Sequence, residues 1–189
     1  MQNLRNTLAK YYPLSDEAKQ LLLPTLEPLP MKKGEVVIPE LYESPYVFFI
    51  EQGAIKTYNI DEKGNKEVVW FGFEGDLCFS LSVYFDISPV LETCEMLEDG
   101  LLYRGDVRFF RQLHQTHLAW ANWARCFAEV HLVQLFQEID EHRPLNAKER
   151  YLSLIKQRPH IQRRAPLKDI ASYLGVSPVT ISRFRKEMK

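Results

Sequence analysis

The C-terminal stretch from Leu167 to Lys189 constrains the fold of this chain more than any other part of its sequence. It predicts a helix, a tight turn at Gly175 and a second helix. Ala171 is small enough for two helices to cross closely, and Gly175 can adopt the positive φ that a sharp turn requires. Ile181 and Phe184 recur three residues apart, which gives the second helix an apolar face. This arrangement is typical of a helix-turn-helix, whose second helix lies in a DNA major groove.

The second helix also has a clear beginning in the sequence. Ser177 is a suitable N-cap, and Pro178 follows at the first helical position, where its missing N–H costs nothing. Several polar or basic side chains then lie off the apolar face, where they can reach base edges and phosphates. We predict that the DNA-contacting residues are Lys168, Ser177, Pro178, Val179, Thr180, Ser182, Arg183 and Lys186.

The charge distribution supports the same interpretation. Residues 143–189 hold twelve Lys and Arg against three Asp and Glu, a net charge of +9. Residues 1–142 hold twelve against twenty-two, a net charge of −10, so the overall charge of −1 conceals a dipolar chain. A basic C-terminal segment attracts a polyanion while the acidic remainder is repelled from it. The alternative, a solvated basic surface, explains the charge but not the helical spacing.

Composition limits the remaining classes. A length of 189 residues with 46% hydrophobic residues suffices for a medium domain and a small one. The sequence has no run of eighteen apolar residues and no secretory signal pattern, so we expect a cytoplasmic protein without a membrane span. Cys78, Cys94 and Cys126 are widely spaced and are expected to be reduced thiols. His114 and His117 could share a metal, but a surface helix explains them better, and we predict no metal site and no cofactor.

The N-terminal half has the pattern of a compact β-roll from about residue 29. Turn signals at residues 33–34, 52–53, 61–65 and 74–76 separate short apolar runs. These runs are EVVI, YVFFIE, AIKTYNI, KEVVWFGF and LLYRG. The segment DEKGNK between two of them predicts a hairpin turn.

After Asp106 the pattern becomes helical. Val107 to Leu113 predicts a short helix, and His117 to Glu141 a long one that is apolar on more than one side. Such a helix needs two partners, and the simplest pair is its own β-roll and the same helix of a second subunit. The alternative is a helix buried in a monomer core. We predict a homodimer, because helix-turn-helix proteins usually read two half-sites, with an interface at Ala121, Ala124, Ala128, His131, Leu132, Leu135 and Ile139.

The residues RPLN, 143–146, are expected to separate the long helix from the C-terminal region. Pro144 ends the long helix, Asn146 can cap the next one, and Glu149 completes a capping box. A basic connector follows that helix. Its side chains best placed for phosphate contacts are Arg163 and Arg164, although exposed arginines are as often merely solvated.

This order of elements resembles the Crp/Fnr family of bacterial transcription regulators. The line FFIEQGAIKTYNIDEKGNKEVVWFGFEGDL is similar to the family's cyclic-nucleotide-binding-type sensor domain in its strand lengths and in Gly53, Gly64 and Gly75. The resemblance implies an α+β fold in three parts. A jelly-roll-like β-roll sensor domain is expected over residues 1–116, a long dimerisation helix over 117–142, and an all-α helix-turn-helix DNA-binding domain over 143–189.

The expected effector site departs from the cyclic-AMP-binding members of that family. Those members use a glutamate in a Gly-Glu-Leu segment and an arginine in an Arg-Ser or Arg-Thr pair, whereas this chain has Phe79-Ser80-Leu81 and Ser88-Pro89-Val90. Residues 67–103 contain eight acidic residues and no Lys or Arg, so a cyclic phosphate would lack a cation from that stretch. We predict no binding of cyclic AMP in the family's usual way. The remaining options are a different, more apolar ligand, a protein partner or no effector. A pocket for such a ligand is expected at Phe79, Ser80, Leu81, Pro89 and Val90, although core packing explains the apolar members equally well.

The resemblance also suggests roles for individual DNA contacts. Ser177, Thr180 and Arg183 match the family's DNA-contacting pattern. Arg183 is the candidate for a bidentate contact to guanine, worth about 1–3 kcal/mol of discrimination. Ser177 and Thr180 are expected at phosphates. Pro178 and Val179 stand where relatives carry Arg-Glu, so a relative's operator is not expected here, and Val179 could contact a thymine methyl group.

The leading hypothesis is a homodimeric, sequence-specific transcription regulator and not an enzyme. Its expected partners are double-stranded DNA, a second copy of the chain, RNA polymerase and an unidentified small-molecule effector. One alternative is a small cupin-like β-roll enzyme, but residues 36–103 contain no histidine to bind a metal. The other is a protein-interaction module that does not bind DNA, against which the basic C-terminal segment argues.

Overall fold

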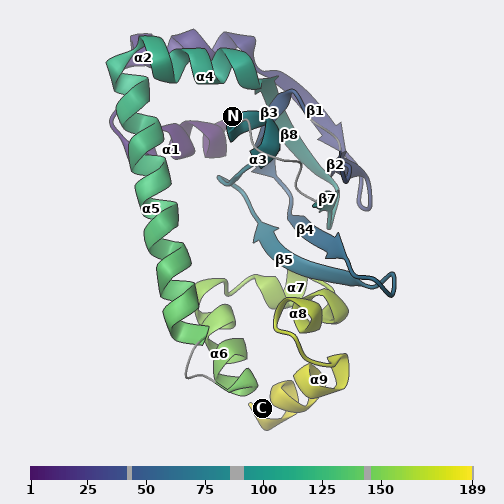
Figure 1. Cartoon of the computed structure of the whole chain (residues 1–189). Coiled ribbons are helices and arrows are strands. Elements are labelled where there is room, and N and C mark those ends of the chain that lie inside the picture. Colours follow the sequence, from purple (N-terminus) through teal and green to yellow (C-terminus); the bar gives the residue numbers. More distant parts are fainter. Residues whose placement is uncertain (42–43, 86–91, 143–145, 189) are drawn as a thin grey trace.

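A computed structural model describes residues 1–41, 44–85, 92–142 and 146–188, without the side chains of residues 137–142. Helices frame a β-roll, and the C-terminal helices lie beneath it (Figure 1). The elements are α1 Gln2–Tyr11, α2 Asp16–Leu22, a 3-10 helix Leu23–Thr25, β1 Glu27–Met31, β2 Val36–Ile38, β3 Tyr46–Gln52, β4 Ile55–Ile60, β5 Lys66–Gly72, β6 Leu77–Phe79, α3 Leu81–Phe85, β7 Thr93–Met96, β8 Gly100–Asp106, α4 Val107–Thr116, α5 Leu118–His142, α6 Ala147–Gln157, α7 Ile161–Arg164, α8 Leu167–Tyr173 and α9 Pro178–Glu187.

The described strands form two four-stranded antiparallel sheets, in the orders β1-β8-β3-β6 and β2-β7-β4-β5. Strand β3 is buried on both faces. Its successive side chains point to opposite sides, so consecutive residues enter different parts of the core. Val47 and Phe49 pack with α1, α4 and α5, whereas Phe48 and Ile50 pack in the core between the sheets. The predicted α+β fold with a β-roll is therefore confirmed, and the β-roll has eight strands among the described residues.

The five apolar runs that predicted strands correspond to β2, β3, β4, β5 and β8. The hairpin between β4 and β5 also forms as predicted. Asp61 accepts hydrogen bonds from the backbone N–H groups of Lys63 and Asn65 at 2.8 and 2.7 Å, and Gly64 has a φ of 83°. All of these contacts lie within the DEKGNK segment, so its sequence alone suffices to predict a hairpin turn.

Three short strands were not predicted. Strand β1 contains Pro28 and Pro30, which interrupt a strand pattern, but β1 lies at the edge of its sheet, where proline is tolerated. Strands β6 and β7 contain three and four residues, too few to show an alternating pattern.

Helix α5 runs down one side of the molecule from α4 to the C-terminal helices (Figure 1). Its first half is fixed by two buried tryptophans. Trp120 donates its indole N–H to the carbonyl of Ala18, and Trp123 donates to the carbonyl of Leu8, both at 3.0 Å. The second half carries exposed apolar side chains, including Phe136 at 63% exposure. The predicted long helix is thus present, with its two halves in different environments.

The C-terminal region follows the predicted local signals. Asn146 and Glu149 form the predicted capping box at the start of α6. Pro144, predicted to end the long helix, lies outside the described residues. The basic connector contains the short helix α7. Among the described residues, no helix combines the length and apolar character needed to cross a membrane.

Candidate nucleic-acid interface and effector cavity

Helices α8 and α9 pack through one apolar side of each. Ile170 and Ala171 of α8 lie in the same buried cluster as Ile181 and Phe184 of α9. Gly175 lies in the turn between them with a φ of 66°, a conformation that residues with a Cβ rarely adopt. The apolar face predicted for the second helix is therefore buried, and its opposite face meets solvent.

The first turn of α9 is closed by hydroxyl groups. Ser177 Oγ accepts a hydrogen bond from the Thr180 N–H at 3.2 Å, and the two hydroxyl oxygens lie 2.8 Å apart. Pro178 occupies the first turn, as predicted. Because the hydroxyl pair uses one of its two protons, the other can be donated to an acceptor such as a phosphate oxygen.

Most of the predicted DNA-contacting side chains are exposed. Val179 is 78% exposed, and the Arg183 side chain is 68% exposed. Arg183 Nε lies 4.0 Å from Glu187 Oε1, at the limit of an ion pair. Such an exposed pair contributes little, so the guanidinium can turn to another acceptor. The exposed members are Lys168, Ser177, Pro178, Val179, Ser182, Arg183 and Lys186, whereas Thr180 is half-buried.

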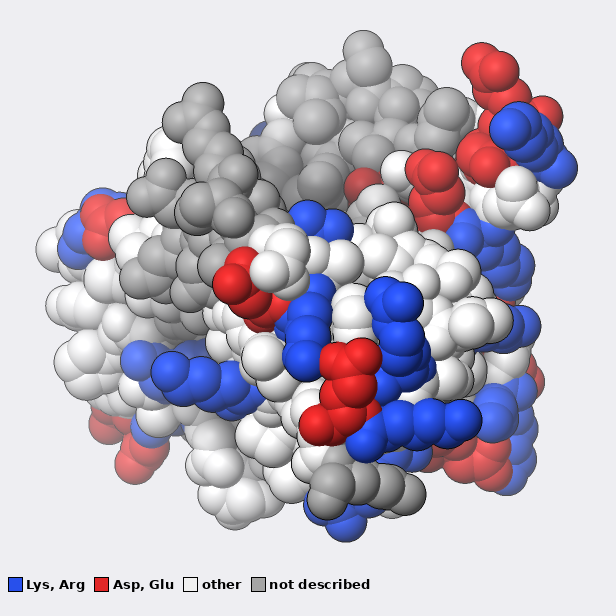
Figure 2. All heavy atoms as spheres, turned by 90° about the horizontal axis from the view of Figure 1, so that it is seen from below, with Lys and Arg blue, Asp and Glu red and all other residues white. Residues whose placement is uncertain are grey.

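Lys and Arg gather on the face formed by the C-terminal helices, with acidic side chains among them (Figure 2). Several of these cations are paired within the chain. Lys148 Nζ lies 2.6 Å from Glu187 Oε2. Arg158 donates to a backbone carbonyl of β5, and Arg185 Nε donates to the Tyr151 hydroxyl at 3.2 Å. Fewer cations are therefore available to contact a polyanion than the net charge of residues 143–189 indicates.

A buried ion pair attaches α8 to the β-roll. Lys56 Nζ on β4 lies 2.9 Å from Asp169 Oδ2 on α8, and each side chain is 6% exposed. Glu95 on β7 lies 3.4 Å from the same ammonium group and 2.7 Å from Lys66 Nζ. Burial acts to raise the pKa of Glu95, but the hydrogen bond from Lys66 and the charge of Lys56 bring it below its ordinary value. Sequence reasoning missed this cluster.

Helix α8 also covers the free edge of β5. The Ser172 hydroxyl donates to the Lys66 carbonyl and accepts the Val68 N–H, both at 2.9 Å. Strand β5 is the outer strand of its sheet, so these backbone groups have no neighbouring strand to pair with. Tyr173 adds a ring contact to Phe71, with centroids 5.4 Å apart. The position of α8 is thus fixed by polar and aromatic contacts together.

Arg164, considered for phosphate contact, is instead paired with the β-roll. Its guanidinium forms two hydrogen bonds to Glu74, at 2.7 and 2.8 Å, and further bonds to Glu98. Burial acts to raise the pKa of Glu74, but the hydrogen bond from Arg164 lowers it overall. The hydrogen bond to Glu74 in turn raises the pKa of Arg164. Arg163, by contrast, is exposed.

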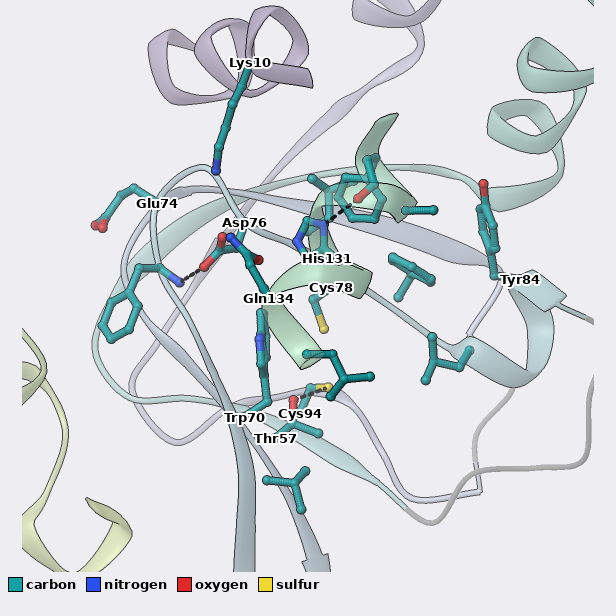
Figure 3. Close-up of a pocket in the computed structure, with 18 of the residues that line it drawn as sticks. Lys10, Thr57, Trp70, Glu74, Asp76, Cys78, Tyr84, Cys94, His131 and Gln134 are labelled. Carbon is teal, nitrogen blue, oxygen red and sulfur yellow. Dashed lines mark hydrogen bonds between the residues drawn. The ribbon is translucent and has the colours of Figure 1, made fainter. Parts of the chain in front are cut away.

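A cavity of about 1290 Å³ lies between the β-roll, α5 and the α6–α7 connector. Figure 3 shows Lys10 extending from α1 toward the side of the cavity that carries Glu74 and Asp76. Arg158 and Arg164 of the connector also line it. Sequence reasoning noted the absence of cations from residues 67–103 but missed these cations, which reach the cavity from distant segments.

Some of the predicted effector residues line this cavity and others do not. Phe79 and Leu81 line the cavity. Ser80 does not belong to the described wall, and its hydroxyl lies 2.8 Å from that of Ser82. Pro89 and Val90 lie outside the described residues.

An aromatic group in the cavity wall contains a half-buried histidine, His114. His114 Nδ1 hydrogen-bonds with the Tyr84 hydroxyl at 2.8 Å, while its Nε2 is buried without a partner among the described residues. Burial lowers the pKa of His114 to about 4 and raises that of Tyr84 to about 12. His114 is therefore neutral near pH 7 and half-buried, whereas His117 is exposed.

The predicted dimer residues also fall on two sides of α5. Ala124, Ala128, His131 and Leu135 line the cavity of their own chain, and Ala121 is half-buried. The side chain of Ile139 lies outside the described residues. The exposed apolar side chains of this half of α5 are Val130, Leu132, Val133, Leu135 and Phe136. Among the described side chains, Leu132 and Leu135 alone belong to both sets, because a heptad spacing does not distinguish the two faces of a helix that is apolar on both.

Comparison with known proteins identifies the type of β-roll. Residues 28–117 match the cyclic nucleotide-binding domain family. No curated protein sequence matches the chain. Among solved structures, FixK2 from Bradyrhizobium japonicum is 16% identical, with a TM-score of 0.71 over 86% of this chain and 84% of its own.

Two further structures extend the similarity over nearly the whole chain. A chain from Eubacterium rectale described as a transcriptional regulator of the Crp/Fnr family is 18% identical, with a TM-score of 0.70 over 92% of this chain and 83% of its own. DNR from Pseudomonas aeruginosa is 21% identical, with a TM-score of 0.56 over 99% of this chain and 86% of its own. Residues 28–117 are therefore similar to a cyclic nucleotide-binding domain, and the chain as a whole has the fold of the Crp/Fnr regulators it resembles.

Proposed function

We propose that this chain is a homodimeric, sequence-specific DNA-binding transcription regulator of the Crp/Fnr type. The observation that carries the proposal is α9, whose apolar side is buried against α8 while its polar and basic side is exposed. Residues 1–116 act as the sensor domain, 117–142 as the dimerisation helix and 143–189 as the DNA-binding domain. The fold shared with FixK2 and the Eubacterium rectale regulator supports this assignment.

Arg183 is the proposed base-reading residue. Its side chain is 68% exposed and is held only by a marginal contact to Glu187, so binding DNA disrupts little structure. A guanidinium can donate two hydrogen bonds to the O6 and N7 atoms of guanine. Ser177 and Thr180, at the N-terminus of α9, position the helix on phosphates through their hydroxyls and the positive end of the helix dipole.

The direct test is selection of bound duplexes from a random library, followed by titration of the selected sequence. A palindrome with half-sites about one helical turn apart is expected. Arg183→Ala should lower the ratio of specific to random-sequence affinity by roughly 5- to 150-fold, the equivalent of about 1–3 kcal/mol. Lys33→Ala, which removes one exposed positive charge from the β-roll, is the matched control and should leave that ratio unchanged. An equal loss of affinity for both kinds of DNA would contradict the role of Arg183.

The dimer contact is proposed for the exposed apolar side of the second half of α5. Leu132, Val133 and Phe136 are 53%, 55% and 63% exposed, and burying such side chains favours association. Phe136→Glu should convert a dimer measured by light scattering into a monomer, because it places a charge in the contact. Gln115→Glu, at an exposed site on α4, adds the same charge elsewhere and should remain dimeric. A wild-type chain that is monomeric with and without operator DNA would refute the dimer.

We also propose that cyclic AMP is not the effector. Glu74 and Asp76 contribute negative charge to the cavity wall, and Arg164 is already paired with Glu74. A cyclic phosphate in this cavity would have to compete with that carboxylate. Thermal unfolding should show no saturable stabilisation by micromolar cyclic AMP, and a saturable rise in Tm would overturn this part of the proposal.

A further inference from the structure

Cys78 and Cys94 are brought together from different sheets. Cys78 lies on β6, beside β3, and Cys94 lies on β7, beside β4. The two residues are 4% and 6% exposed and share one apolar cluster between the sheets. Nothing in their separation along the sequence predicted this contact. The two thiols lie close enough to shift each other's pKa, and Cys94 Sγ lies 3.3 Å from the Thr57 hydroxyl.

Both sulfur-bearing side chains belong to the wall of the cavity (Figure 3). A small neutral oxidant can therefore approach them through a space of about 1290 Å³ without unfolding the β-roll. Cys126 differs on each of these points. It lies on α5, is half-buried, and is absent from the described cavity wall.

We propose that Cys78 and Cys94 form a peroxide-oxidisable thiol pair that closes into a disulfide between the two sheets of the β-roll. Disulfides between facing sheets are known from other β-sandwiches, so the architecture permits such a bond. In cytosolic proteins, disulfides of this kind are usually transient and redox-sensing.

The environment assigns different roles to the two sulfur atoms. The hydrogen bond from Cys78 lowers the pKa of Cys94, with a further contribution from Thr57, whereas the same hydrogen bond raises the pKa of Cys78. Cys94 is the nucleophile in this proposal, because the Thr57 hydroxyl, 3.3 Å from its sulfur, can donate a hydrogen bond to the thiolate, which is the reactive form. Cys78, on β6 of the other sheet and in the same buried cluster, is the thiol that attacks the oxidised sulfur.

The reaction proceeds in two balanced steps. The Cys94 thiolate attacks one oxygen of the peroxide and breaks the O–O bond, which gives a sulfenic acid and, after protonation of the leaving oxygen, water or an alcohol. The sulfur of Cys78 then attacks the sulfur of the sulfenic acid. The S–S bond forms, and the departing hydroxide leaves as water with the proton of Cys78. Overall, two thiols are oxidised and one peroxide is reduced.

The test uses the full-length chain and hydrogen peroxide, followed by alkylation under denaturing conditions and peptide mapping without reductant. Loss of two of the three thiols, with one cross-linked peptide joining Cys78 to Cys94 and Cys126 still alkylated, is the expected result. Dithiothreitol should restore all three thiols. Preferential oxidation of Cys126, or protection of both Cys78 and Cys94 in folded protein, would overturn the proposal.

Variants separate the proposed pair from other oxidation products. Cys126→Ser should form the cross-link at the wild-type rate. Cys78→Ser should still react with peroxide at Cys94 but stop at the sulfenic acid, which a dimedone probe detects by mass. A Cys78→Ser protein without that adduct, although folded by circular dichroism, would remove Cys94 as the nucleophile. Because peptide mapping of the wild-type chain needs no variant and no DNA, its result is independent of the proposed regulatory function.

Discussion

The buried pair between Lys56 and Asp169 predicts an unusual pattern of stabilities. Lys56→Met leaves the Asp169 carboxylate, 6% exposed, without a cation at ion-pair distance among the described residues. Removing one partner of a buried pair typically costs about 3–5 kcal/mol, because the other charge stays buried and uncompensated. Asp169→Asn should cost less, roughly 1.5–3 kcal/mol, because Lys56 keeps Glu95 at 3.4 Å.

The double variant Lys56→Met/Asp169→Leu is the decisive member of the series. Replacing both charges with apolar side chains removes the uncompensated charge, so its stability should lie within about 1 kcal/mol of wild type or above it. The exposed pair of Lys148 and Glu187 provides the control. Its two side chains are 43% and 45% exposed, and Lys148→Met should cost less than about 1 kcal/mol.

Urea unfolding measures these differences in the free energy of unfolding. Following it by tryptophan fluorescence and by circular dichroism shows which part of the chain unfolds first. The three tryptophans, Trp70, Trp120 and Trp123, all precede residue 143, so fluorescence reports the β-roll and α5, whereas far-ultraviolet circular dichroism also reports the C-terminal helices. The two transitions should coincide in wild type and separate in Lys56→Met, with helical signal lost first. The reasoning is refuted if both single variants lie within 0.5 kcal/mol of wild type, a tolerance typical of surface substitutions, or if the double variant shows the sum of the single losses.

Two further predictions concern local features. The pKa of His114 is lowered to about 4 by burial, so its neutral form stabilises the fold above about pH 6.5 and this contribution is lost as the pH falls toward 4. In His114→Gln, the loss of Tm between pH 7 and pH 5 should be smaller than in wild type, whereas the exposed His117→Gln should match wild type. Gly175→Ala should cost about 1–2 kcal/mol in urea unfolding through its φ of 66°, since no atom lies within 4 Å of an added Cβ. Gly175→Asn should cost less, and an equal cost for both would point to a steric cause.

The sequence predicted those elements whose signals are local. A capping residue, a hairpin turn or a glycine between two apolar stripes acts over a few residues, and these marked the start of α6, the β4–β5 turn and the α8–α9 turn. Strand β1 was missed because Pro28 and Pro30 obscure its pattern, although an edge strand accepts them. Strand β1 was therefore not predicted because the strand order, which a local pattern does not show, decides whether a proline is tolerated.

The missed parts of the candidate site depend on contacts between distant segments. Lys56 and Asp169 are 113 residues apart, and Arg164 and Glu74 are 90 apart. Lys56 did carry a local signal, since a lysine within the apolar run AIKTYNI needs a partner if that strand is covered. The partner, however, belongs to a helix whose docking on the β-roll no local pattern specifies.

These distant pairs change how the basic C-terminal segment should be interpreted. Lys148 and Arg164 neutralise carboxylates of the same chain, and Arg158 binds a backbone carbonyl of β5. The cations exposed on and near α9, such as Lys168 and Arg183, face solvent. Because only cations that meet phosphates release counterions, the salt dependence of DNA binding should reflect this exposed group and not the net charge of +9. The paired cations instead fix the position of the exposed ones, which in the proposed complex contact DNA.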